Sequence, residues 1–163
     1  MKKFIFTFVL VLATLSASAQ YRVDRLVTAG RSALFYEDFV LSIKYFNLAI
    51  GAKPYLYEPW YYRSVAKFNL DDYMGAESDA SEAINLNPYI NDIYDLRAIC
   101  RIRQQRYDDA IADYNSAIRL EPRNRNYWFN RALCQMEAKN YDKALLELDT
   151  VITKWKDLSL IHI

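Results

Sequence analysis

Apolar residues recur along this chain at intervals of three and four. The stretch from residue 107 to 118 shows the pattern clearly, with apolar side chains at Tyr107, Ala110, Ile111, Tyr114, Ala117 and Ile118. Such spacing places the apolar side chains on one face of an α-helix. Only 3 glycines and 4 prolines occur, and 15% of the residues are aromatic, a composition that suits a helical protein and argues against disorder. We therefore predict an all-α fold.

Three prolines, Pro54, Pro88 and Pro122, recur at a fixed interval of 34 residues. Shifting the chain by this interval also aligns aromatic and small residues in four further slots: Trp60, Tyr94 and Trp128; Phe39, Tyr73, Tyr107 and Tyr141; Ser42, Ala76, Ala110 and Ala144; and Ala49, Ala83, Ala117 and Val151. Because the proline ring and its missing N–H do not fit inside a helix, each proline is expected to end one helical unit and begin the next. The chain is therefore built from repeats.

These aligned residues resemble the signature of the tetratricopeptide repeat (TPR), whose period is also 34 residues. The resemblance covers roughly residues 23–156 and implies four repeats, at 23–56, 57–90, 91–124 and 125–158, the last with Lys156 in the proline slot. It further implies four antiparallel helix pairs stacked into a right-handed α-solenoid. Small residues in one slot would let the two helices of each repeat approach closely: Gly30, Ser64, Ala98 and Ala132.

Three arginines and three acids occupy matching slots, sixteen residues apart: Arg63 with Asp79, Arg97 with Asp113, and Arg131 with Glu147. In the first repeat both slots change together, to Ala29 and Tyr45. We infer that the arginine of each first helix pairs with the acid of the second helix. A half-exposed pair of this kind would stabilise the fold by about 0.5–1 kcal/mol and would help to fix the register of the helices.

The N-terminus has the pattern of an export signal at residues 1–19. Lys2 and Lys3 precede an apolar run from Phe4 to Leu15, and residues 16–19 supply the small-residue cleavage pattern before Gln20. A membrane anchor would need roughly 20 apolar residues, which this run does not reach. No cysteine occurs near the cleavage site, so lipoprotein acylation is not expected. The mature chain is therefore expected in the periplasm of a Gram-negative bacterium or outside the cell.

Charge and residue inventory exclude several classes of function. Loss of the two signal lysines changes the formal charge from +1 to −1, which leaves no electrostatic footprint for nucleic acid or acidic lipid. His162 is the only histidine, so a histidine-based metal site or catalytic triad is not expected. The glycines are too far apart to form a phosphate-binding loop. We expect no catalytic site, no metal and no cofactor.

The two cysteines, Cys100 and Cys134, occupy the same slot of successive repeats. Export would place them in an oxidising compartment, which favours a disulfide. Equivalent positions on neighbouring first helices should, however, lie about 8–10 Å apart, whereas a disulfide needs Cα atoms within about 7 Å. Buried free thiols are the preferred interpretation.

The resemblance also indicates a binding face, because in TPR proteins the first helices line an inner, concave surface that binds peptides or helices. Taken slot by slot, this face would present Val27, Arg31, Leu34, Tyr61, Val65, Phe68, Asp95, Ile99, Ile102, Phe129, Leu133 and Met136. Several TPR co-chaperones bind a C-terminal carboxylate there through a Lys/Asn/Arg clamp, but only Arg31 is basic in this set. An apolar helix or extended segment of a protein partner is therefore expected. The equal alternative is that a further part of the same polypeptide packs against this face.

After Trp155 the chain leaves the repeat pattern and ends in an apolar stretch at 158–163, which resembles the translation of an adapter used in DNA library preparation. We interpret it as a possible non-native tail on a truncated gene, with a natural chain end as the alternative. The expected function is a non-catalytic protein–protein interaction scaffold or adaptor of the bacterial cell envelope. Two alternatives stay open: the N-terminal module of a larger envelope enzyme or cell-wall-binding protein, and a binder of glycans or small molecules.

Overall fold

The structure is a computed structural model that describes residues 22–159, with side chains described as far as residue 153. Residues 22–35 form the first helix, which is followed by α2 (Phe39–Ala52), α3 (Tyr57–Asn69), α4 (Tyr73–Leu86), α5 (Asn91–Arg103), α6 (Tyr107–Leu120), α7 (Arg125–Glu137) and α8 (Tyr141–Ser159). No strand occurs between residues 22 and 159, so the all-α prediction is confirmed. The expected signal peptide at 1–19 and the last four residues of the expected tail lie outside the described residues.

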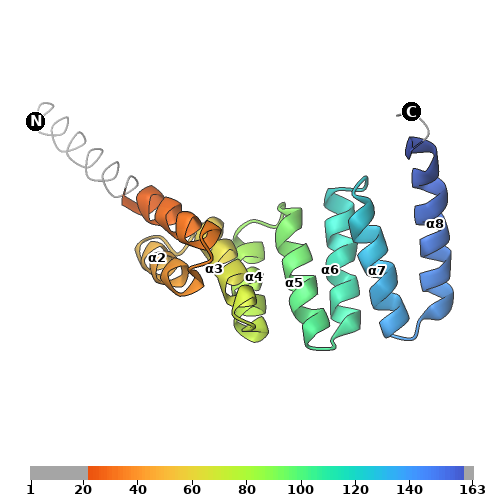
Figure 1. Cartoon of the computed structure of the whole chain (residues 1–163), viewed down its shortest axis with the longest axis horizontal. Coiled ribbons are helices and arrows are strands. Elements are labelled where there is room, and N and C mark those ends of the chain that lie inside the picture. The colour runs from red at the N-terminus through yellow and green to blue at the C-terminus, as the bar shows by residue number, and fades with distance from the viewer. Residues whose placement is uncertain (1–21, 160–163) are drawn as a thin grey trace, which may run out of the picture.

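The helices stack in the order of the sequence. Each of the helices α2 to α8 packs against the helix before it or after it in the chain, and Figure 1 shows them succeeding one another along the molecule. This arrangement is the α-solenoid that the repeat pattern predicted, in which each unit buries its apolar face only against its neighbours. Within the described residues, no helix is long and apolar enough to span a membrane.

The prolines set the lengths of the second helices. The helices α2, α4 and α6 each contain 14 residues and end shortly before Pro54, Pro88 and Pro122. In α8 the same slot holds Lys156, and the helix continues for 19 residues. A proline at this slot would have stopped the helix, since it lacks the N–H that the next turn requires.

The turn inside each repeat uses one residue in the left-handed backbone conformation, with φ between 59° and 63°: Glu37, Asp71, Gln105 and Lys139. The second helix begins directly after this turn. Asp38 and Asp72 cap α2 and α4 by accepting hydrogen bonds from the N–H groups of Leu41 and Gly75. This geometry reverses the chain within three residues and makes the two helices of a repeat antiparallel.

The small slot of the first repeat permits close contact between its two helices. A Cβ atom placed on Gly30 would lie only 2.6 Å from Cε1 of Phe46, whose side chain is fully buried. The Oγ of Ser42 donates a hydrogen bond to the Gly30 carbonyl at 3.0 Å across the same interface. Gly30 is therefore required by the size of Phe46 and not by its backbone conformation.

The arginine–acid pairs predicted from the sequence are present in all three repeats. Arg97 on α5 contacts Asp113 on α6, with Nη2 2.6 Å from Oδ1, and its Nη1 donates to Ser81 Oγ on α4 at 3.1 Å. Arg63 contacts Asp79 and Arg131 contacts Glu147 in the same way. Each of these arginines also donates a hydrogen bond to an asparagine of the preceding second helix. Each arginine therefore joins three helices and two repeats.

The expectation that these pairs are half-exposed is wrong. The acid side chains of the three pairs are only 3–7% exposed, and the arginine side chains are 15–17% exposed. The reason lies in the stacking, because the preceding second helix covers the side of the pair that a single repeat would leave in water. A charge buried in this way depends on its partner far more than a surface charge does.

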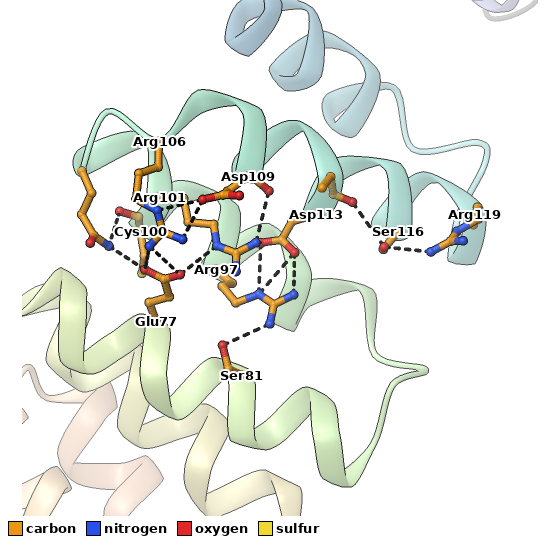
Figure 2. Close-up of polar contacts among 12 residues, drawn as sticks. Glu77, Ser81, Arg97, Cys100, Arg101, Arg106, Asp109, Asp113, Ser116 and Arg119 are labelled. Carbon is orange, nitrogen blue, oxygen red and sulfur yellow. Dashed lines mark hydrogen bonds and ion pairs between the residues drawn. The ribbon is translucent and has the colours of Figure 1, made fainter. Parts of the chain in front are cut away.

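A larger polar network surrounds the central pair (Figure 2). Arg101 on α5 contacts Asp113 and also Glu77 on α4, which accepts further hydrogen bonds from Gln104 and Arg106. Burial alone would raise the pKa of Glu77, but the hydrogen bonds from Arg101 and Gln104 outweigh it, and the pKa of this carboxyl is lowered. The network ties α4, α5 and α6 together on the side where the second helices lie.

The same contacts give the stack an inner and an outer side. The first helices of successive repeats touch: α3 contacts α5, and Asn91 on α5 donates to the Tyr127 hydroxyl on α7 at 2.9 Å. Between the second helices α4 and α6, the side chain of Arg97 makes the link, from Ser81 to Asp113. We call the side of the stack formed by the first helices the inner face, which the repeat resemblance implies is the binding side.

Candidate functional site

The inner face carries a pocket of about 430 Å³ where the third and fourth repeats meet. Its lining comes from the first helices α5 and α7 and from the second helix α6: Ile99, Ile102, Tyr107, Tyr114, Asn130, Leu133, Cys134 and Glu137. Three of these residues, Ile99, Ile102 and Leu133, belong to the set expected on the binding face. The stack itself supplies the walls, because Ile99 and Leu133 occupy the same slot of consecutive repeats.

The pocket has an apolar floor and a few polar groups. Tyr114 is 1% exposed and packs in a core cluster that includes Ala98 and Cys134. Its hydroxyl lies near Asp95 and Asn130, which both affect its pKa, and Glu137 adds a carboxylate to the lining. An apolar cavity with a small number of polar groups is typical of a site that binds an apolar side chain or a small ligand in a defined orientation.

Asp95 lies one helical turn before the pocket on α5. Its Oδ1 atom is buried and has no hydrogen-bond partner. Burial raises the pKa of the Asp95 carboxyl, and the nearby charge of Asp92 raises it further, against the opposing effect of the hydrogen bond with Tyr114. Asp95 is therefore the least satisfied acid on the inner face.

Tyrosines from three helices surround this pair of carboxylates. Tyr61 extends from α3, and its pKa is raised to about 12 by burial and by the charges of Asp92 and Asp95. The Tyr127 hydroxyl on α7 lies 3.3 Å from Asp92 Oδ1. Tyr114 approaches from α6. We call Asp92, Asp95 and these three tyrosines the acidic patch.

The other expected binding-face residues are distributed more widely. Arg31 lies in a separate hollow beside Phe35 and Tyr36, with its guanidinium 5.0 Å from the centre of the Tyr62 ring. The Phe68 ring packs 5.5 Å from Tyr73. Val27, Leu34 and Val65 are half-buried, whereas Phe129 and Met136 are 45% and 43% exposed on α7. None of these residues lines the pocket.

Sequence reasoning missed five lining residues: Tyr107, Tyr114, Asn130, Cys134 and Glu137. The slot argument considered first helices alone, and Tyr107 and Tyr114 belong to α6. A signal was available at Tyr114, whose slot holds Ala80 in the preceding repeat. The larger ring brings a hydroxyl to the inner face that no earlier repeat can supply from this slot.

Both cysteines are free thiols and are buried, which agrees with the preferred sequence interpretation. Burial raises the pKa of Cys100 to about 12 and that of Cys134 to about 11. A thiol with so high a pKa contains very little thiolate near neutral pH and is a poor nucleophile. Within residues 22–159, no group of three or more His, Cys, Asp or Glu side chains is arranged to hold a metal ion.

Comparison with known families identifies the repeat. A family model for the tetratricopeptide repeat matches residues 96–157. This range includes every residue that lines the pocket but excludes Asp92 and Asp95. The helix pairs that precede this range have the same arrangement as those within it. The chain is a tetratricopeptide-repeat protein. No curated protein matches this TPR chain.

Solved structures of TPR proteins have the same fold. A crystal structure of MamA superposes with a TM-score of 0.83 at 18% identity, over 90% of this chain and 80% of MamA. The first TPR domain of Spaghetti (RPAP3), bound to the HSP90 peptide SRMEEVD, gives 0.71 at 24% identity, over 73% and 94% of the two chains. The Arabidopsis OM64 TPR domain gives 0.70 at 20% identity, over 72% and 98%. At these identities the likeness is one of fold.

Proposed function

We propose that this TPR protein is a non-catalytic scaffold of the bacterial cell envelope that binds a segment of another protein on its inner face. The observation that carries the proposal is the pocket between α5 and α7, where Ile99, Ile102 and Leu133 surround an apolar cavity. Burial of one or two apolar side chains there would supply the anchoring contact that dominates many protein interfaces. The surrounding exposed residues Phe129 and Met136 would extend the contact along α7.

The fold supports a binding role because a solenoid presents one long inner wall built from equivalent helix faces. The related fold of the RPAP3 domain holds a peptide, SRMEEVD. In this chain the inner face lacks the basic residues that a carboxylate-terminated acidic peptide needs, since Arg31 alone is basic in the expected set and lies over Tyr62. The proposed partner is therefore an apolar helix or extended segment.

A photo-crosslinking experiment tests the binding site. The full chain would carry a benzophenone amino acid in place of Leu133 in one variant and in place of Met74 in the other, and each would be irradiated in an envelope extract of the source bacterium. Met74 is a suitable control because it is 76% exposed on α4, away from the inner face. We expect a specific adduct from position 133 only. Equal adducts from both positions, or none from position 133, would refute the inner face as the binding site.

The proposed location rests on residues 1–19, which have the features of a cleaved export signal. Fractionation of the source bacterium, followed by N-terminal sequencing of the protein, tests it. We expect the protein in the periplasmic or secreted fraction with Gln20 as its first residue. Recovery from the cytoplasm with Met1 or Lys2 at its start would contradict the envelope role and would leave the binding proposal intact.

A further inference from the structure

The described acids that are at least partly withdrawn from water differ in how they are compensated. Asp79, Asp113 and Glu147 on the second helices each form an ion pair with an arginine. Asp95 on the inner face forms none: its Oδ1 is buried without a partner, and no basic side chain contributes to its pKa. An ionised carboxylate withdrawn from water is costly unless a cation or several hydrogen bonds compensate for it. The three fully buried carboxylates are compensated within the chain, and the half-buried Asp95 is not.

The surroundings of Asp95 strengthen this contrast. The titratable groups that face it are Asp92 on its own helix, Tyr61 on α3, Tyr114 on α6 and Tyr127 on α7. Burial is the largest cause of the raised pKa values of Tyr61 and Tyr127, and the charges of Asp92 and Asp95 raise both pKa values further. No lysine or arginine of the described residues forms an ion pair with Asp92 or Asp95. The acidic patch therefore has negative charge without a cation of its own, with Asp92 exposed and Asp95 half-buried.

The acidic patch and the pocket are close enough for one ligand segment to contact both. Asp95 and Ile99 are one helical turn apart on α5, which corresponds to about 6 Å along the axis. Tyr114 belongs to both sites, since it lines the pocket and its hydroxyl lies close enough to Asp95 to affect the pKa of that carboxyl. In an extended segment, residues two positions apart point to the same side and are separated by about 6.6 Å. One residue over Asp95 would thus place a neighbour two positions away at the mouth of the pocket.

From these observations we propose that the inner groove selects a partner segment containing a basic residue two positions from an apolar one. The lysine or arginine pairs with Asp95 and Asp92 beside the half-buried ring of Tyr61, whose face favours positive charge. The leucine, isoleucine or methionine enters the pocket between Ile99 and Leu133. This inference rests on the proposed function, because it names the chemistry of the segment that the scaffold binds. The chosen segment is opposite in charge to SRMEEVD, the peptide bound by the RPAP3 domain.

Arrayed synthetic peptides test this selectivity with the purified, labelled full chain. Each peptide has twelve residues of randomised neutral sequence around a fixed centre, which is Lys-x-Leu, Glu-x-Leu, Ser-x-Leu or Lys-x-Ser. We expect the Lys-x-Leu set to bind at least about five-fold more strongly than the Glu-x-Leu and Ser-x-Leu sets. Replacement of the leucine by serine should weaken binding by a similar factor, because the pocket then contains no apolar side chain.

Two variants assign the preference to the acidic patch. Asp95→Asn keeps the size of the side chain but removes its charge. We expect this variant to lose most of its preference for the Lys-x-Leu set over the Ser-x-Leu set, because only Asp92 then remains to pair with the lysine, while its preference for leucine over serine is kept. Asp108→Asn is the matched control, since Asp108 is an exposed acid at the start of α6. It should retain the full preference for lysine.

The failures of the two proposals are distinguishable. If the chain binds Lys-x-Leu, Ser-x-Leu and Glu-x-Leu peptides equally, or if Asp95→Asn retains the lysine preference, the selectivity inference is refuted and the peptide-binding function stands. If no peptide set binds and Leu133 also gives no crosslink in the envelope extract, the proposed function itself is refuted.

Discussion

The Nη2 atom of Arg97 lies 2.6 Å from Oδ1 of Asp113, whose side chain is only 3% exposed. The same guanidinium donates to Ser81 on the preceding second helix. We expect Arg97→Ala to lower the free energy of unfolding by about 3 kcal/mol, at the lower end of the range for a broken buried pair because Arg101 still contacts Asp113. Urea denaturation of the full chain followed by circular dichroism provides the measurement.

A double-mutant cycle separates the direct interaction from general damage. Combined with Asp113→Ala, the Arg97→Ala change should show a coupling energy above about 1 kcal/mol. Arg119→Ala is the control, since Arg119 is exposed on α6 and donates to Ser116 at the surface. A coupling energy near zero would show that the two buried charges do not stabilise each other.

Gly30 leaves room for the aromatic ring of Phe46 between the two helices of the first repeat. Gly30→Ala would gain helix propensity but would place a methyl group 2.6 Å from the Phe46 ring. We expect a net destabilisation of about 1–2 kcal/mol, because overpacking of a tight core outweighs the propensity gain. Adding Phe46→Leu should recover most of the loss, as the fourth repeat combines Ala132 with Leu148 in the same slots. Failure of the second change to rescue the first would indicate that Gly30 has another role.

The left-handed residue of each intra-repeat turn should tolerate glycine better than a branched residue. Gln105 has φ of 59°. We expect Gln105→Gly to leave stability unchanged or to raise it by up to about 1 kcal/mol, since glycine relieves the strain of this conformation but adds freedom to the unfolded chain. Gln105→Val should destabilise the protein by about 1–2 kcal/mol. Thermal melting of both variants gives the comparison, and equal stabilities would contradict the assigned turn geometry.

The raised pKa of Asp95 predicts a characteristic pH dependence of stability. The folded state holds this carboxyl at a higher pKa than the unfolded state, first through burial and then through Asp92. Protonated Asp95 therefore favours the fold at acid pH, and this contribution is lost as the pH rises through the folded-state pKa. We expect Asp95→Asn to raise the melting temperature at pH 7 and to give a smaller difference at pH 4. A larger benefit at pH 4 than at pH 7 would contradict the assigned direction.

The cysteines predict slow thiol chemistry in the folded protein. Cys100 and Cys134 are buried, with the pKa of each raised by burial to about 12 and 11. We expect both thiols to react with a chromogenic disulfide reagent at pH 8 only after denaturation, and no intramolecular disulfide to form in air. Rapid labelling of the native chain would show that the repeats open often enough to expose them.

The repeat architecture could be predicted from sequence because it depends on slots that recur. Proline positions, helical periodicity and the pairing of Arg97 with Asp113 all follow from the 34-residue alignment. The burial of that pair did not follow, since it depends on a neighbouring repeat that covers it. The pocket also depends on one departure from the repeat, the tyrosine at 114 where the second repeat has Ala80. The left-handed residues Glu37, Asp71, Gln105 and Lys139 recur at the repeat interval and are all polar, but none is the glycine or asparagine that usually marks such a conformation.

The arginine bridges have a consequence for how the stack opens. Each bridge joins the second helices of two successive repeats, so loss of one repeat exposes the buried acid of its neighbour. The first repeat has Ala29 in the arginine slot and Tyr45 in the acid slot. It therefore takes part in these bridges only through the hydrogen bond that Arg63 donates to Asn47. Fraying should therefore start at the N-terminal side and proceed in one direction, with amide hydrogens of α2 exchanging ahead of those of α6.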